Sequence, residues 1–291
     1  MKNILIPTDF SDHAKNAGFY AVEIAKVIKS QIYILHTFNI AASKLYPPVY
    51  SGTMPSEQER KALTQQLEKD NEINLRTFKE TILKGQAEPV AHLAQSTGFV
   101  SESVNQFAEK KNADLIVMGT KAKLKRSDAS LAPITFDVIN SGVIPVLAIH
   151  ENIKFSPVKK IAIAVNKNFD QELLNLFETV IKFAKYFKSE IHILYCSKTD
   201  DADEINIFNN SVREEANSLL SGIKWTLVNI KNNNNEEKLA TKVDEYIFAN
   251  NINILSLITR KQDLFQKIYQ SSKIQAKKFH TEIPLLAIPG V

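Results

Sequence analysis

The chain has 291 residues, 44% of them hydrophobic and 23% charged, with a formal net charge of +4, which is typical of a globular protein with two ordinary cores. The single cysteine, Cys196, excludes an intrachain disulfide and a thiolate zinc cluster. No basic run is interleaved with aromatic residues and no apolar stretch reaches the ~18 residues of a bilayer span, so we expect a cytoplasmic protein without nucleic-acid or membrane partners.

The first part of the chain alternates short apolar runs with helical segments. Asn3–Pro7 predicts a strand, and Asp12–Lys29 predicts a helix because its apolar residues recur at helical spacing, with Ser11 as the N-cap. The elements predicted next are a strand over Gln31–Phe38, a long Pro-rich loop over Asn39–Ser56, a charged helix over Glu57–Lys84, a strand over Pro89–Gln95 and a helix over Val100–Lys111.

The stretch from Asp114 to Ile149 predicts a βαβ crossover. Asp114–Met118 is a short apolar run that suits a strand buried on both faces, and Gly119 follows it. A basic loop, a helix that begins near Pro133 and a second apolar run over Val143–Ile149 complete the unit. Because ligands of open α/β sheets bind beyond the carboxyl ends of the strands, the loop after Gly119 is expected at a ligand site.

The pattern restarts after the polar segment Glu151–Pro157, which predicts a linker. About 20 residues are missing between the second strand and the third helix of the second copy. Such a repeat in register at both ends indicates two copies of one domain. The matched pairs are Ile4 with Ile161 (offset 157), Ala25–Leu35 with Ala184–Leu194 (offset 159), and Val104 with Val243 and Pro145 with Pro284 (both offset 139).

The sequence therefore predicts an α/β protein with two repeated doubly wound, Rossmann-like domains. The domains are expected over residues 1–150 and 158–291, with the linker at 151–157, and each holds a five-stranded parallel sheet with helices on both faces. We expect the halves to pack as a pseudo-dimer through Pro145–Ile149 and Pro284–Ile288, because apolar edge strands left open invite aggregation. A further homodimer stays open.

Three segments in order resemble the universal stress protein family: ILIPTDFS at Ile4–Ser11, ADLIVMGT at Ala113–Thr120 and IPVLAI at Ile144–Ile149. The resemblance covers the first half closely and the second half through the repeat. It implies a fold like that of the adenine-nucleotide α-hydrolases and pairing of subunits through the last strand. It leaves the ligand open, since the family includes members that bind ATP and members that do not.

The nucleotide-binding members resemble one another in a pattern of Gly, two residues, Gly, nine residues, Gly, then Gly or a neighbour, then Ser or Thr. On this chain only Gly119 keeps its glycine, and Pro133 removes an N–H donor at the helix start that would face phosphates. Pro133 is also well explained as a first helical residue. The resemblance thus implies a degenerate site for ATP or another adenine nucleotide, formed by Pro7, Thr8, Asp9, Met118, Gly119, Thr120, Ala122, Ala132 and Pro133.

Two features of the first half have alternative interpretations. Asp9 stands where the resemblance places an acid that touches adenosine, but an aspartate there is equally explained as a cap for the turn before the first helix. The four cations of the loop could attract an anion, although a solvated surface loop is favoured. They are Lys121, Lys123, Lys125 and Arg126.

In the second half no glycine remains at the motif positions and Asn166 replaces the acid, so no nucleotide is expected there. The residues at those positions are Ile258, Lys261, Ser271 and Ser272, and Ser272 is explained as a helix N-cap. No metal-binding histidine spacing and no GxSxG elbow occur, which argues against a metal site and a nucleophilic enzyme.

Three functions remain in order of preference. The first is a non-catalytic stress-response protein that acts through contacts with unknown protein partners and binds nucleotide weakly or not at all. The second is a sensor of ATP or another adenine nucleotide, or a weak ATPase, with a modified pocket in the first half. The third is an enzyme of the wider adenine-nucleotide α-hydrolase-like group, which the missing glycines disfavour most because it needs an intact phosphate loop.

Overall fold

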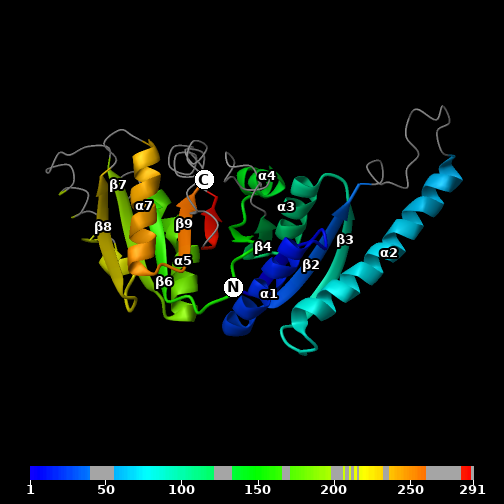
Figure 1. Cartoon of the computed structure of the whole chain (residues 1–291), viewed down its shortest axis with the longest axis horizontal. Helices are drawn as coiled ribbons and strands as arrows, with labels where there is room; N and C mark the ends of the chain where they lie inside the picture. Colours follow the sequence, from blue (N-terminus) through cyan, green and yellow to red (C-terminus); the bar gives the residue numbers. More distant parts are fainter. Residues whose placement is uncertain are drawn as a thin grey trace.

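The computed structural model of the chain describes residues 1–39, 56–120, 133–165, 171–197, 216–231, 236–259 and 283–289, with the single positions 206, 210, 213 and 214. Figure 1 shows a broad sheet flanked by helices. Its strands are β1 (Asn3–Pro7), β2 (Gln31–Phe38), β3 (Ala91–Thr97), β4 (Leu115–Thr120), β5 (Val146–His150), β6 (Lys160–Val165), β7 (Glu190–Ser197), β8 (Trp225–Lys231), β9 (Ile254–Ile258) and β10 (Leu285–Ile288). The helices are α1 (Asp12–Ile28), α2 (Glu57–Leu83), α3 (Val100–Lys110), α4 (Pro133–Ser141), α5 (Gln171–Phe187) and α7 (Glu236–Asn250).

The described strands form one ten-stranded sheet in the order β3-β2-β1-β4-β5-β10-β9-β6-β7-β8. All neighbours within each half are parallel, which confirms the predicted fold class of two repeated five-stranded parallel sheets. The halves meet where β5 and β10 pair antiparallel, with Leu147 opposite Leu286. The strand order of the second half mirrors that of the first, as expected for two copies related by a pseudo-twofold axis.

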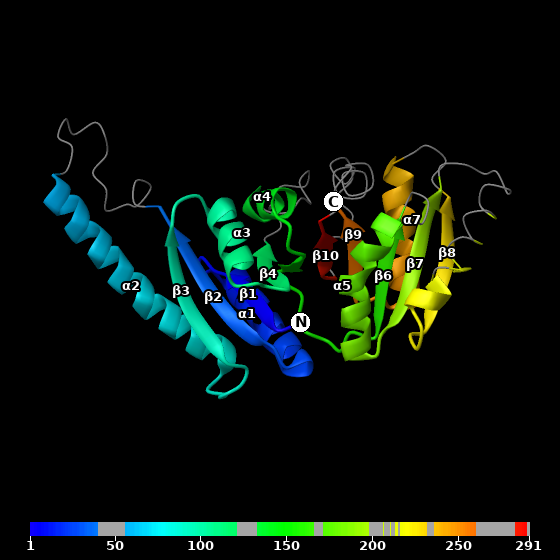
Figure 2. The same cartoon turned by 180° about the vertical axis from the view of Figure 1, so that it is seen from behind.

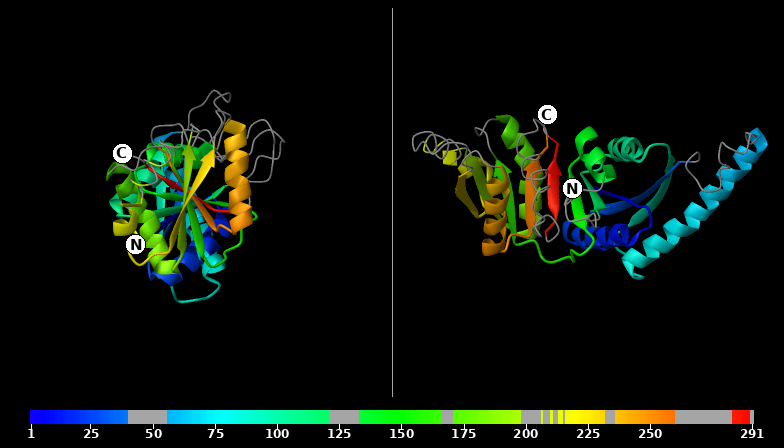
Figure 3. Two further views of the ribbon diagram at one scale, coloured as in Figure 1. Left: turned by 90° about the vertical axis from the view of Figure 1, so that its left-hand side faces the viewer. Right: turned by 45° about the horizontal axis from the view of Figure 1, so that its top comes forward.

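Helices cover both faces of the sheet (Figures 2 and 3). The side chains of α1, α2 and α5 pack in one apolar core, and those of α3, α4 and α7 pack in the other. Each core continues through the seam between the halves, since Leu147 and Leu286 belong to the first and Val146 and Ala287 to the second. The strands are therefore buried on both sides, which explains why they appear in the sequence as unbroken apolar runs.

Four predicted strand boundaries were wrong by two or three residues, among them the end of β3, which lies at Thr97 instead of Gln95. β3 begins at Ala91 instead of Pro89, and β5 begins at Val146 instead of Val143. Both differences lie next to a proline, which has no N–H for a ladder. Pro145 joins the sheet only through its carbonyl, which accepts from Ile116 N at 2.9 Å. β4 runs to Thr120, two residues beyond the predicted end.

The connection between the halves lies against α1. Asn16 on α1 donates through Nδ2 to the carbonyl oxygens of His150 at 3.0 Å and Ile153 at 2.8 Å. The ring of Phe155 meets Tyr20 edge-on with centroids 5.1 Å apart. The polar segment that the sequence indicates as a linker is thus fixed to the first half by the hydrogen bond from Asn16 to Ile153 and by the aromatic contact of Phe155.

Helix α2 is the longest described element, and only its second half packs on the body. Leu75 and Phe78 are buried, whereas most side chains before Asn71 are exposed and that half extends beyond the sheet (Figures 1 and 2). Ser56 and Glu59 form a capping box at its start. Among the described residues no helix, α2 included, combines the length and apolar character needed to cross a membrane.

Candidate functional site

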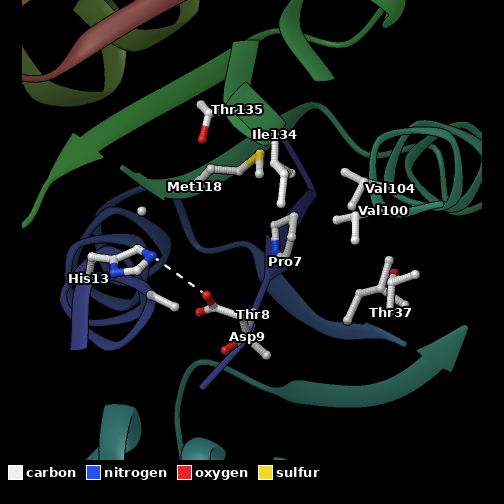
Figure 4. A pocket seen from close by; sticks show the side chains of 13 residues that line it. Pro7, Thr8, Asp9, His13, Thr37, Val100, Val104, Met118, Ile134 and Thr135 are labelled. Carbon is white, nitrogen blue, oxygen red and sulfur yellow. Dashed lines mark ion pairs between the residues drawn. The ribbon is translucent and has the colours of Figure 1, made fainter. Parts of the chain in front are cut away.

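A pocket lies at the carboxyl ends of β1, β2 and β4 (Figure 4). The chain leaves β1 towards β2 and later crosses to β4 on the other side, so the pocket sits at the switch point where open α/β sheets bind ligands. Its volume is about 120 Å³. It is lined by Pro7, Thr8, Asp9, His13, Ala14, Leu35, Thr37, Val100, Val104, Met118, Gly119, Ile134 and Thr135.

The inner wall of the pocket is mainly apolar. Val100 and Val104 enter from α3, and Ile134 enters from α4 (Figure 4). The hydroxyl of Thr37 at the end of β2 is buried there and has no hydrogen-bond partner within the part of the chain that the structure describes. Ligand pockets usually measure ~300–1,000 Å³, whereas a cavity of about 120 Å³ is the size that holds a single small ring.

Asp9 stands at the mouth of the pocket with its side chain 64% exposed. Its Oδ1 accepts from the Ser11 backbone N–H at 3.1 Å and from the Ser11 hydroxyl, and its Oδ2 lies 3.6 Å from His13 Nε2 (Figure 4). These contacts are those of an aspartate that fixes the turn before a helix. Ser11 also caps α1 as predicted, by accepting from the Ala14 N–H. The turn role of Asp9 is therefore present, and its exposed carboxylate leaves a ligand role open.

Gly119 has a structural reason to be glycine. A Cβ atom there would overlap the His13 carbonyl oxygen and would lie 2.8 Å from Ala14 N. Because backbone atoms cannot retreat as a flexible side chain can, any larger residue would push the first turn of α1 away from β4. The close approach of α1 and β4 thus explains Gly119 without a bound phosphate.

The residues that the resemblance implies for a nucleotide site fall into three groups. Pro7, Thr8, Asp9, Met118 and Gly119 line the pocket. Thr120 is buried at the end of β4, and Pro133 is the exposed first residue of α4, and neither is among the lining residues. The others lie outside the described residues, together with the basic loop: Ala122, Ala132, Lys121, Lys123, Lys125 and Arg126.

Two histidines near the pocket are held neutral by burial. His36 Nδ1 lies 2.8 Å from the Thr8 carbonyl oxygen, and desolvation lowers the pKa of its imidazole below the ordinary value. His150, at the end of β5, is 5% exposed, and neither ring nitrogen has a hydrogen-bond partner among the described residues. Desolvation also lowers the pKa of His150. Both rings therefore favour the uncharged form at neutral pH.

Groups with metal or nucleophile chemistry do not gather in the part of the chain that the structure describes. No cluster of three or more His, Cys, Asp or Glu side chains is present among those residues. Cys196 is buried in β7, and desolvation raises the pKa of its thiol to about 12. A thiol with such a pKa stays protonated, which makes it a poor nucleophile.

Sequence reasoning missed most of the wall of the pocket, including Thr37, Val100, Val104 and Ile134. A signal for Thr37 was available, because β2 pairs with β1 and the carboxyl ends of parallel neighbours lie at one edge. In the second half Ile258 ends β9 and is half-buried. The other motif positions there lie outside the described residues: Asn166, Lys261, Ser271 and Ser272.

Comparisons with known proteins agree on one family. Residues 1–150 match the model of the universal stress protein family. The chain is 28% identical to Universal stress protein MJ0531 of Methanocaldococcus jannaschii over 148 residues, which cover 51% of this chain and 81% of that protein. It is 24% identical over 200 residues to the Universal stress protein E homolog of Haemophilus influenzae, of whose length it spans 63%, with 66% of this chain covered.

Among solved structures, a universal stress protein from Archaeoglobus fulgidus is similar over both halves. The TM-score is 0.66 at 14% sequence identity, with 99% of this chain and 98% of that chain covered. At this identity the likeness supports the fold alone, over nearly the whole length of both chains.

Proposed function

The chain belongs to the universal stress protein family, and from that premise we propose that it is a non-catalytic stress-response protein that acts through contacts with other proteins. Its first-half pocket binds adenine nucleotides weakly or not at all, and hydrolyses them at most slowly. The observation that carries this proposal is the size of the pocket, because about 120 Å³ accepts a ring but is well below an ordinary ligand pocket.

The phosphate side of the site supports the same conclusion. Helix α4 begins at Pro133, so the first position of this helix offers no N–H to an anion. Each charge-assisted hydrogen bond is worth roughly 1.5–3 kcal/mol. The loss of one such bond at Pro133 therefore weakens binding by about ten- to a hundredfold. That change moves a micromolar site towards millimolar affinity.

One observation favours the second candidate, a sensor of ATP or another adenine nucleotide. The Asp9 carboxylate is exposed at the mouth of the pocket and can accept hydrogen bonds beyond those from Ser11. A carboxylate at this place could hold the hydroxyl groups of a ribose whose base enters the apolar cavity. The adenosine end of a ligand does not depend on the missing phosphate donors.

The amount of nucleotide that co-purifies with the protein distinguishes the two candidate functions. The protein is denatured after purification without added nucleotide, and the released small molecules are measured by absorbance near ~260 nm and by mass. The proposal predicts that far less than one nucleotide is released per chain. Close to one adenine nucleotide per chain would contradict it and would place the sensor first.

A further inference from the structure

Strand β3 ends the sheet, and its register shows which of its backbone groups point outward. Ile32 N donates to Val90 O at 2.8 Å and Gly98 N donates to Phe38 O at 3.1 Å, so the even-numbered positions face β2. In a parallel ladder the N–H and C=O of one residue point to the same side and the next residue points to the other. The backbone groups of Ala91, Leu93, Gln95 and Thr97 therefore face away from the sheet.

Only the Ala91 end of this strand edge has a hydrogen-bond partner among the described residues. Lys79 on α2 donates through Nζ to the Ala91 carbonyl oxygen at 2.9 Å. In the described part of the chain, the outward backbone groups of Leu93, Gln95 and Thr97 have no partner. A stretch of edge strand thus presents N–H and C=O groups in the pattern that an added strand requires.

A groove of about 550 Å³ lies beside this stretch, between β3 and the diverging half of α2. Four polar residues of α2 and Gln95 of β3 line it: Gln65, Glu68, Lys69, Glu72 and Gln95. The four α2 positions follow the i, i+3, i+4, i+7 spacing of one helix face. Gln95 bridges the two elements by donating from Nε2 to the Glu68 carbonyl oxygen at 3.0 Å, and its buried Oε1 has no partner among the described residues.

We propose that this α2–β3 groove binds an extended peptide segment of a partner protein, which adds as a further strand to Leu93–Thr97. The inference rests on the proposed function, because it names a surface for the protein contacts. Backbone groups fix the extended conformation of the segment, and polar side chains at alternate positions face the mixed charges of Glu68, Lys69 and Glu72. Glu72 forms an ion pair with Arg76 at 2.6 Å. Glu68 and Lys69 are therefore the charges more available to a bound segment.

An extended segment fits this edge better than a second copy of the chain. A single strand needs only ~4.8 Å beside β3. A folded copy that offered its own β3 would bring its own projecting α2 into the same space (Figure 3). The opposite edge, β8, supplies a comparison, because its outward positions include the exposed Asn229.

The test uses the full chain and a phage-displayed library of linear peptides as the probe. Thr97→Pro removes one outward N–H of β3, and Asn229→Pro removes one outward N–H of β8 as the control. We expect enriched peptides that bind Thr97→Pro about two- to tenfold more weakly than the parent protein and bind Asn229→Pro unchanged. Amide hydrogen exchange should show slowing at Leu93, Gln95 and Thr97 when peptide is bound.

If Thr97→Pro fails to fold, amide hydrogen exchange of the unmodified protein with and without peptide still tests the proposal. No enriched peptide, peptides that protect other amides, or self-association that protects the β3 amides would each overturn the proposal. Mg-ATP binding is measured on the same preparation. Tight nucleotide binding would refute the proposed function, whereas failure of the peptides without nucleotide binding refutes the groove alone.

Discussion

At the scale of single residues, Asp244 on α7 carries an ionisable carboxyl where its counterpart in the first half has an amide. The repeat places it over Asn105, which donates through Nδ2 to Ser141 Oγ at 2.9 Å and to the Val138 carbonyl oxygen at 3.3 Å. Asp244 is buried, and no described residue forms a hydrogen bond with its Oδ1. Desolvation, with a smaller contribution from the charge of Glu245, raises the pKa of this carboxyl to about 9.

This raised pKa gives a pH-dependent loss of stability. In the unfolded chain Asp244 ionises near pH 3.8, whereas in the folded chain it keeps its proton up to about pH 9. The contribution of this carboxyl to the free energy of unfolding is therefore complete below pH 3.8 and is lost as the pH rises towards about 9. Asp244→Asn should therefore raise the free energy of unfolding at pH 7, by at most about 4 kcal/mol. Urea unfolding at pH 4.5 and 7 measures it, with the exposed Asp137→Asn as control. An equal effect at both pH values would refute the assignment.

The packing explanation of Gly119 leads to a second prediction. Gly119→Ala should lower the free energy of unfolding by about 1–3 kcal/mol without any ligand, because the new methyl group overlaps the backbone of α1. Thermal unfolding measures this loss. Ile134→Ala, which also changes the pocket lining but removes a side chain that is 48% exposed, should cost much less. An unchanged melting temperature for Gly119→Ala would show that the glycine serves only a ligand.

At the scale of elements, α2 combines a packed half and a projecting half. Its first turns are stabilised by the capping box of Ser56 and Glu59, with few contacts to the body. Local opening should therefore begin at this end, so amides in 60–70 should exchange faster than those in 75–83. Ser56→Ala should lower the local free energy of opening in the first turns by about 0.5–2 kcal/mol, so their amides should exchange faster. Thr64→Ala should not change this exchange. Uniform protection along α2 would contradict this picture.

Most elements could be predicted from the sequence because each of them has a local signal. Periodic apolar residues identify α1, and Ser11 marks its start. Boundaries beside Pro89 and Pro145 were missed, since local patterns do not show where the ladder begins. Most of the pocket wall could not be predicted, because Thr37 and Val100 come from elements distant in the sequence. A glycine motif also cannot distinguish a bound phosphate from a close helix, as Gly119 shows.

At the scale of the whole molecule, the seam of β5 and β10 joins the halves into one sheet. Val146 lies opposite Ala287 and is 1% exposed. Val146→Lys would place an ammonium group in an apolar core, so it should cost more than about 3 kcal/mol or separate the halves. Unfolding and small-angle scattering measure the two effects, with the exposed Val143→Lys as the control. A normal melting temperature and an unchanged scattering profile would count against the seam.

The proposed function is tested most directly by calorimetric titration with Mg-ATP. Moderate ionic strength is required because it screens the long-range attraction of the cations between Lys121 and Arg126. The account predicts a dissociation constant near the millimolar range or no measurable heat, with Asp9→Ala changing little. A dissociation constant in the low micromolar range that Asp9→Ala abolishes would contradict it and would identify the chain as a nucleotide sensor.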